Sequence, residues 1–321
     1  MIYLAKELSV VIAALDGYNE IKELLLSIER QTIKNLLEVI LVCQDRASLA
    51  LPDNVCSDLI VLQGNRDLLL NEARTLGVLN STAPFVVILE DQCLPRADCF
   101  EHLLDRLKQG WSGVGPSIHH GNKCSAVARA ANCVTYGQWM GRRKSGQMDF
   151  IAGYNSAFPK RLLLARGEQL QQDFIVPSLM LSSLRAQGHK FFFETKAVMV
   201  HWEASRFSGT KSILIPQGRA MGKLRSRTWP VWKRWMYSFL SPALAAFRYG
   251  RAILAYLRLY GFRIFTAEFL YLLPITVVWT YGELTGYWTK DKSVYSQVSR
   301  VEKNRTPFIE PCEAISASEV A

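Results

Sequence analysis

Residues 8–15 read LSVVIAAL, a short apolar run rich in β-branched side chains that ends at Asp16-Gly17. Such a run predicts a β-strand that is buried on both faces of a sheet. Apolar residues at helical spacing follow over residues 21–28, and residues 37–43 (LEVILVC) form a second run of the strand type. The order strand, helix, strand predicts a βαβ unit with two parallel strands.

The same alternation continues along the chain. We predict a strand at residues 58–63, a helix at 68–79 and a strand at 84–89 (PFVVIL), which ends at Glu90-Asp91-Gln92. Strands that alternate with helices indicate an α/β fold with a mainly parallel sheet. Ligands of such sheets bind beyond the carboxyl ends of the strands. We therefore expect Asp16, Asp45 and the Glu90-Asp91 pair to lie around one crevice.

The middle of the chain predicts further elements of both kinds. We expect a helix at residues 100–109, a strand at 151–159, a helix at 180–186 and paired strands at 190–200. The paired strands deliver His201-Trp202 to the end of a strand. A basic run at Arg142, Arg143 and Lys144 lies between glycines and fits either phosphate binding or a solvated loop.

Composition limits the functions that the chain can have. Of its 321 residues, 49% are hydrophobic and 21% are charged, which excludes a disordered chain. The mean hydropathy of +0.05 is high for a purely soluble enzyme. The formal net charge of +10 suits nucleic acid, anionic lipid or a phosphorylated substrate. Residues 211–263 contain no acidic residue and interleave basic with aromatic side chains, which is typical of a membrane interface.

The basic and aromatic region divides the chain into three predicted parts. These are an α/β domain at residues 1–210, a membrane-associated helical region at 211–290 and a loose polar tail at 291–321. The uncharged stretch at 269–282 contains Pro274 and is shorter than the roughly 20 apolar residues of a membrane span, which favours anchoring on an anionic membrane surface over crossing. Nucleic-acid binding ranks last because we find no common nucleic-acid-binding motif.

Two further features predict a cytoplasmic location for the first domain. The seven cysteines form no CxxC pair and are odd in number, which favours reduced thiols over a disulfide framework. The first residues lack the charged and apolar regions of a secretory signal.

Five segments together resemble a known family. They are SVVIAALDGYNE, LEVILVCQD, NEARTLGVLNSTAPFVVILEDQCLP, AGYNSAFPKRLLLARG and LRAQGHKFFFETKAVMVHW, and they extend over about residues 8–205. In this order and spacing they are similar to the family 2 inverting glycosyltransferases of the GT-A fold. The resemblance implies a mixed α/β sheet, a nucleotide-diphosphate sugar donor, Mg²⁺ or Mn²⁺, and an acceptor hydroxyl whose attack inverts the anomeric carbon.

The resemblance also implies roles for individual residues. Asp45 matches the acid that contacts uracil, and Arg74 with Gly77 matches an arginine and a glycine on the next helix. Glu90-Asp91-Gln92 matches the DxD motif, with Glu and Gln in place of the two outer acids. Asp91 and His201 are the implied metal ligands. The residues implied in binding the donor are Ala14, Asp16, Asp45, Arg74, Glu90, Asp91, Gly153 and Asn155.

The sequence departs from the family at the catalytic base. In the family it is an acid of an ED pair, but here Val176 and Pro177 occupy that spacing before Gly188. Asp173 is the nearest acid and is our predicted base. A base must reach the acceptor hydroxyl within hydrogen-bond distance, and Asp173 does not stand at the family's position. A solvated loop acid is therefore an equally good interpretation of Asp173.

Residues beyond the resemblance leave two interpretations open. Gln217, Gly218, Arg219, Arg225 and Arg227 fit a loop that closes over the donor diphosphate or a surface that faces lipid headgroups. For the whole chain we predict sugar transfer to a lipid-linked or polysaccharide acceptor at the cytosolic face of a membrane. The alternative is a degenerate nucleotide-sugar-binding module without turnover, which is a partner of an active transferase.

Overall fold

The computed structural model describes residues 5–52, 58–141, 144–262, 266–303, 305–310 and 316–317. The chain divides into two compact units: residues 1–119, 142–201 and 315–321 form unit 1, and residues 120–141 and 202–314 form unit 2. This division differs from the predicted boundaries at 210 and 290. Residues 120–141 contain a helix that packs on the C-terminal helices, while the Ala317 amide donates to Glu23 in unit 1 (2.8 Å). Arg142 and Arg143 of the basic run lie outside the described residues.

Within the described residues, nine strands form one sheet. Their order is β3 (Leu59–Gln63), β2 (Leu37–Cys43), β1 (Leu8–Ala13), β4 (Phe85–Leu89), β8 (Ser156–Pro159), β6 (Gly113–His120), β9 (Phe191–His201) and β5 (Cys93–Pro95), with β7 (Gly146–Met148) also paired to β9. The first four strands are parallel, and β8, β5 and β7 pair with their neighbours antiparallel. The predicted α/β fold with a mixed sheet is confirmed.

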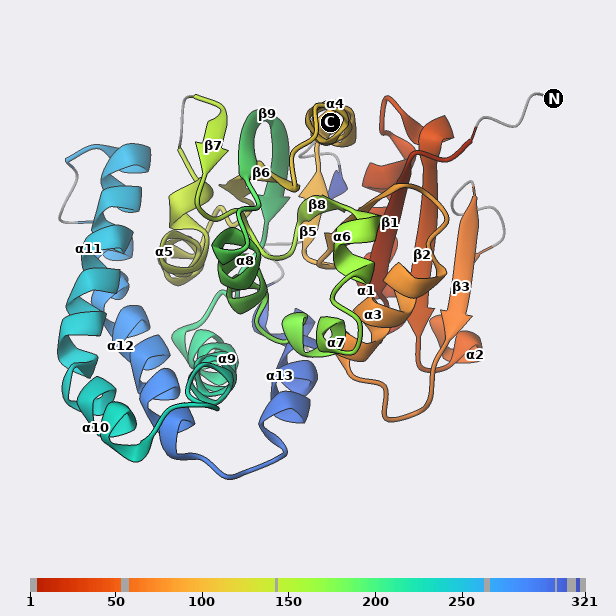
Figure 1. Cartoon of the computed structure of the whole chain (residues 1–321). Coiled ribbons are helices and arrows are strands. Elements are labelled where there is room, and N and C mark those ends of the chain that lie inside the picture. Colours follow the sequence, from red (N-terminus) through yellow and green to blue (C-terminus); the bar gives the residue numbers. More distant parts are fainter. Residues whose placement is uncertain are drawn as a thin grey trace. The chain divides into compact units, whose positions relative to one another are not determined.

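The register of the parallel strands places their carboxyl ends at one edge. Ala13 of β1 pairs with Val42 of β2, and Ile12 of β1 pairs with Leu89 of β4. The chain therefore leaves β1, β2 and β4 at neighbouring points, and β1, β2 and β3 run side by side in Figure 1. This is the edge at which the sequence predicts the ligand site.

Helices cover the sheet of unit 1. They are α1 (Tyr18–Glu29), η1 (Lys34–Leu36), α2 (Arg46–Leu49), α3 (Leu70–Asn80), α4 (Cys99–Lys108), α6 (Lys160–Leu164), α7 (Gln169–Asp173) and α8 (Pro177–Ala186). Residues of α3, α6, α7 and α8 share one apolar core with alternate residues of the strands, including Val11, Ile40 and Phe158. The strand predicted at 151–159 is only four residues long, and the paired strands predicted at 190–200 are one strand, because β5 and β7 supply the pairing partners of β9.

Unit 2 is helical in its described part. Its helices are α5 (Ala126–Thr135), η2 (Gly137–Trp139), α9 (Phe207–Arg225), α10 (Val231–Phe239), α11 (Ser241–Tyr260), α12 (Ala267–Trp288), α13 (Val294–Lys303) and η3 (Thr306–Phe308). Of the two interpretations of residues 217–227, a closing loop is wrong for Gln217, Gly218, Arg219 and Arg225, because these residues lie in α9. Among the described residues, no helix combines the length and the apolar character that crossing a bilayer requires.

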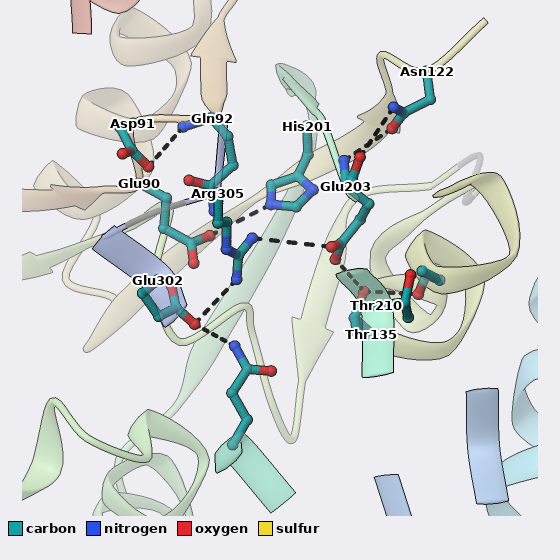
Figure 2. A network of polar contacts seen from close by, with 12 residues as sticks. Glu90, Asp91, Gln92, Asn122, Thr135, His201, Glu203, Thr210, Glu302 and Arg305 are labelled. Carbon is teal, nitrogen blue, oxygen red and sulfur yellow. Dashed lines mark hydrogen bonds and ion pairs between the residues drawn. The ribbon is translucent and has the colours of Figure 1, made fainter. Parts of the chain in front are cut away.

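The tail predicted to be loose contains α13 and is tied to unit 2 by buried charges. Arg305 donates to Glu302 of α13 (3.0 Å) and lies 3.9 Å from the carboxylate of Glu203. Glu302 also accepts a hydrogen bond from Gln217 of α9. Glu203 accepts from Thr135 of α5 (3.2 Å), as Figure 2 shows. This network links three helices that are distant in the sequence.

Helices α9 and α12 meet through glycines that recur at the same spacing. Gly218 and Gly222 on α9 face Gly282 and Gly286 on α12. A Cβ atom on Gly218 would lie 2.6 Å from the carbonyl oxygen of Trp279, and one on Gly282 would lie 2.6 Å from that of Ile215. Only glycine allows two helix backbones to approach so closely. The interface is therefore built from backbone rather than from large side chains.

A buried carboxylate fixes the same helix pair. Glu283 of α12 is almost fully buried and accepts hydrogen bonds from Arg225 (2.8 Å), Arg248 and Tyr287 (2.7 Å). Burial raises the pKa of Glu283, but Arg248, Tyr287 and Arg225 outweigh this effect and hold the pKa below its ordinary value. Arg225 is thereby committed to a structural ion pair.

Candidate active site

The acidic segment Glu90-Asp91-Gln92 begins where β4 ends, at the carboxyl edge of the parallel strands. Glu90 and Gln92 are buried, while Asp91 is partly exposed. The Oδ1 atom of Asp91 accepts a hydrogen bond from the amide of Gln92 (3.0 Å), which fixes the turn into β5. Of the two acids, Asp91 is thus the one with access to solvent.

Asn155 holds Glu90 in place from the neighbouring strand. Its Oδ1 atom accepts from the Glu90 amide (3.0 Å), and its Nδ2 atom donates to the Glu90 carboxylate (2.7 Å). Asn155 is fully buried and has a φ of 60°. This left-handed conformation is tolerated by Asn better than by most residues. The role that the structure gives Asn155 is to orient the acidic segment.

His201 completes the group from the end of β9. Its Nε2 atom lies 3.7 Å from the Glu90 carboxylate, and its side chain is fully buried. The pairing of β9 with β5 sets His201 opposite Cys93 and so brings it beside the acidic segment. Figure 2 shows the His201 ring directed at Glu90, with Asp91 and Gln92 next to it. The sequence prediction that His201 lies with the acidic pair agrees with this geometry.

The residues of this group fit a divalent cation only in part. Carboxylate and imidazole are both metal ligands, and Glu90 and His201 face each other. Among the described residues, however, no cluster of three or more His, Cys, Asp or Glu side chains is arranged to hold a metal ion. The few ligands around Glu90 and His201 fit a cation like Mg²⁺, which takes one or two carboxylates and draws other ligands from substrate phosphates and water.

Three other residues implied in donor binding follow β1 and β2. Ala14 is buried, and its amide donates to the carbonyl of Val42 (2.9 Å). Asp16 and Asp45 are exposed, and the Oδ1 atom of Asp45 accepts from the amide of Ala47 (3.0 Å) at the start of α2. Asp45 is therefore a helix cap in this structure. Its predicted contact with a base stays a prediction.

Arg74 and the two matched glycines serve packing. The Arg74 guanidinium is buried and lies 3.8 Å from the centre of the Tyr154 ring. A Cβ atom on Gly77 would overlap Val11 of β1, and one on Gly153 would overlap Pro177 at the start of α8. Gly77 thus sets the distance of α3 from the sheet, and Gly153 that of α8 from the segment before β8. Their donor contacts stay predictions.

The environment of Asp173 differs from that of an accessible base. Its carboxylate is buried and accepts from Arg166 at Nε (2.6 Å) and at a terminal nitrogen (3.4 Å). Burial raises the pKa of Asp173 despite the opposing effect of Arg166. The interpretation as a solvated loop acid is wrong, because the side chain is buried in this ion pair. The prediction of a catalytic base stays open, and the ion pair weighs against it.

Two contacts of the site were not predicted. The hydrogen bonds between Asn155 and Glu90 depend on the pairing of β4 with β8, and the ion pair of Arg166 with Asp173 depends on the turn between α6 and α7. The single signal for the first contact is an Asn at the start of an apolar strand segment. We find no sequence signal for the second.

The fold and this edge define an α/β protein with an acidic ligand site at the carboxyl ends of parallel strands. Residues 9–165 match the family model described as Glycosyl transferase family 2, so this part of the chain is similar to that family. The predicted resemblance is confirmed over this range, which ends before the fifth segment, and the match supports a nucleotide-sugar glycosyltransferase. It includes Glu90, Asp91 and Asn155 but ends before Asp173 and His201. No curated protein matches the chain.

Proposed function

We propose that this protein transfers a sugar from a nucleotide-diphosphate donor to a hydroxyl of a lipid-linked or polysaccharide acceptor, on the cytosolic face of a membrane. The observation that carries the proposal is the group at the end of β4. There Asn155 orients Glu90, His201 faces it, and Asp91 remains partly exposed beside them. This group lies at the edge where α/β sheets bind their ligands.

The proposed reaction is a single displacement that inverts the anomeric carbon. The acceptor oxygen forms a bond to that carbon while the bond from the carbon to the diphosphate oxygen breaks. The nucleoside diphosphate leaves with the electron pair, and the proton of the hydroxyl passes to a base. The contribution of the protein is to position the two substrates and to stabilise charge on the leaving diphosphate.

Asp91 and His201 are the proposed ligands of Mg²⁺ or Mn²⁺. When bound, the cation supplies positive charge that neutralises the leaving diphosphate. Glu90 is held by Asn155 beside them and contributes negative charge to the same place. Asp91, as the more accessible acid, is the residue whose loss is expected to matter most.

The proposed base, Asp173, is tested by a single substitution. Asp173→Asn separates its two roles, because a base contributes about 10²–10⁴-fold to the rate without holding the fold. A purely structural partner of Arg166 would instead lower the melting temperature, since its loss leaves a buried guanidinium without its charge partner.

Donor hydrolysis tests the proposal directly. The full chain is purified in detergent and assayed for nucleoside diphosphate release from UDP-, GDP- and dTDP-sugars, with Mn²⁺ or with a chelator. We expect release from one donor class, its loss with the chelator, and a loss of at least about 10²-fold in Asp91→Ala. The matched control is Asp149→Ala, because Asp149 is an exposed acid of the same unit that pairs with Arg185 (3.3 Å) at the surface.

The second candidate, a degenerate nucleotide-sugar-binding module, has specific support. Gln92 and the pair Val176-Pro177 stand where acids are expected, and the nearest acid is bound by Arg166. Binding of one donor that is weakened in Asp91→Ala, without turnover even when membrane extract supplies acceptors, would favour this candidate over the enzyme.

A further inference from the structure

Helix α10 presents an apolar face to solvent. In its nine residues no side chain is buried, and Trp232, Trp235, Met236 and Phe239 recur at helical spacing on one face. Trp232 is 65% exposed and Phe239 is 77% exposed. A surface helix of a soluble protein normally turns such a stripe toward the core. Here the stripe faces outward, which is the arrangement of a helix that lies in a membrane interface.

Helix α12 also turns apolar side chains toward solvent. Leu270, Leu273, Val277 and Tyr281 form an exposed apolar stripe. The opposite face buries polar and small residues, namely Thr276, Thr280, Gly282, Glu283 and Gly286, together with Leu272, Ile275 and Tyr287. Apolar side chains outside with small and polar ones between helices are typical of helices that contact lipid.

Helix α11 extends this surface. Its exposed apolar residues are Phe247 and Leu254, which share a face with Arg251 and Arg258, whereas its buried residues include Ala252 and Ala255. The stripes of α10 and α12 are continuous, since the rings of Trp235 and Trp288 pack with their centres 4.6 Å apart. The three helices pack on one another and lie side by side in Figure 1. We call the exposed apolar residues of α10, α11 and α12 the outer apolar face.

The charge around the outer apolar face has one sign. Residues 204–267 contain no acidic residue. The two acids of α12 are each bound by arginine: Glu268 accepts from Arg129 (2.9 Å), and Glu283 lies buried among Arg225 and Arg248. Helices α10 and α11 themselves contain no acidic residue, and Arg248 of α11 pairs with Glu283 of α12. This pattern complements a surface of phosphate headgroups.

We propose that the outer apolar face is a membrane-docking surface that lies in the plane of an anionic bilayer and buries its apolar side chains in the boundary between headgroups and acyl chains. The inference deepens the proposed function by naming how the protein reaches an acceptor at a membrane. It depends on unit 2 alone. Docking in the plane needs no helix that spans the bilayer.

A second copy of the chain fits this surface less well. A symmetric dimer would place the same face against itself and so set Arg251, Arg258 and Lys233 near their own counterparts. Like charges opposite each other oppose association. An anionic bilayer has an apolar interior that can bury the exposed apolar side chains and negative headgroups that can pair with the basic residues.

Vesicle binding tests the docking surface. The full chain is diluted from detergent into vesicles of phosphatidylcholine, alone or mixed with phosphatidylglycerol, and the bound fraction is measured by flotation. We expect binding to the mixed vesicles that falls with added salt. Phe239→Glu combined with Trp232→Glu should weaken it by about tenfold or more, because each buried aromatic side chain contributes more than the energy of a tenfold change.

Leu79→Glu is the matched control. Leu79 on α3 of unit 1 is 58% exposed, so the change has the same chemistry outside the outer apolar face. Melting curves and donor release of all variants should be unchanged, which separates a failure of docking from a failure of the proposed function. A second measurement is quenching of tryptophan emission by brominated acyl chains, which should weaken in Trp232→Phe.

Three results would overturn the inference. The chain could stay with the soluble fraction in the presence of both kinds of vesicle. Leu79→Glu could lose as much binding as the double variant. The double variant could convert a dimer to a monomer on gel filtration while vesicle binding stays the same, which would assign the face to a second copy.

Discussion

Large apolar side chains are exposed far more often in unit 2 than in unit 1. Phe158, Phe174 and Phe191 of unit 1 are fully buried, whereas Phe239 and Phe247 of unit 2 are among the most exposed side chains of the described residues. Unit 1 is therefore held together by the volume of its side chains. The helices of unit 2 are joined by close glycine contacts and by the ion pairs of Glu283, as well as by an apolar cluster that includes Tyr256, Leu272 and Ile275. The large apolar residues outside this cluster, such as Phe239 and Phe247, are available for contact outside the protein.

The largest effect is expected where a side chain is added between helices of unit 2. Gly222→Leu places a side chain against the backbone carbonyl of Glu283, which cannot move without separating α9 from α12. We expect a loss of about 4 kcal/mol or more in the free energy of unfolding. Seven of the eight tryptophans lie in unit 2, so tryptophan fluorescence during denaturation measures this unit. In the control Gly250→Leu on α11, a Cβ atom would meet no atom within 4 Å, and no loss is expected because leucine is a better helix former than glycine.

The complementary change removes volume from unit 1. Phe158→Ala leaves a cavity in the core of β8, and we expect a loss of about 3–5 kcal/mol. The same substitution at Phe239 should change the free energy of unfolding by less than about 0.5 kcal/mol in the absence of lipid. Hydrogen exchange of the strand amides measures unit 1 in both variants. Equal losses at Phe158 and Phe239 would mean that the two interiors do not differ as described.

Much of unit 1 could be predicted from the sequence, and its site only in part. Residues 8–15, 37–43 and 84–89 are continuous apolar runs ended by polar residues, and the parallel pairing then forces their carboxyl ends together. That is why the edge with Asp45 and Glu90-Asp91 was foreseen. The role of Asn155 and the ion pair of Asp173 were not, because they depend on which strand pairs with β4 and on how one turn folds.

For unit 2, the composition of the sequence predicts an interface but not how the helices pack. The basic and aromatic residues of 211–263 indicated an interface, yet neither the end of α10 at Phe239 nor the glycine contacts of α9 and α12 follow from composition. The sequence leaves a closing loop as one of two interpretations of Gln217, Gly218 and Arg219. In the structure Gly218 lies inside a helix, since it is the position where another backbone approaches.

The contribution of the buried Glu283 carboxylate to the stability of unit 2 depends on pH. Glu283→Gln leaves Arg225 and Arg248 without their carboxylate, and we expect a loss of about 3 kcal/mol at neutral pH. The pKa of Glu283 in the folded protein lies below its ordinary value of about 4.5. Its stabilising contribution is therefore complete above that value and is lost as the pH falls through the lower, folded pKa.

Denaturation monitored by tryptophan fluorescence between neutral and acidic pH measures this contribution. The difference between the parent protein and Glu283→Gln should shrink on the acid side of pH 4.5. Glu268→Gln is the control, because Glu268 pairs with the single Arg129 and is less buried. Its loss should be near 1 kcal/mol. If the difference in free energy of unfolding stays constant down to acidic pH, the ionised Glu283 carboxylate does not stabilise the packing of α12.

The smallest effect concerns glycines that touch nothing. Gly250 lies inside α11, and a Cβ atom there would meet no other atom, so Gly250→Ala should stabilise unit 2 by about 0.5–1 kcal/mol through the better helix propensity of alanine. Gly110 of unit 1 has as much space but a φ of 93°, and Gly110→Ala should destabilise by about 1 kcal/mol. Because both sites are open, the opposite signs would arise from backbone conformation alone. A loss in Gly250→Ala would instead mean that α11 packs through Gly250 as α9 does through Gly222, and the small residues of unit 2 would then matter even on the helix that carries part of the outer apolar face.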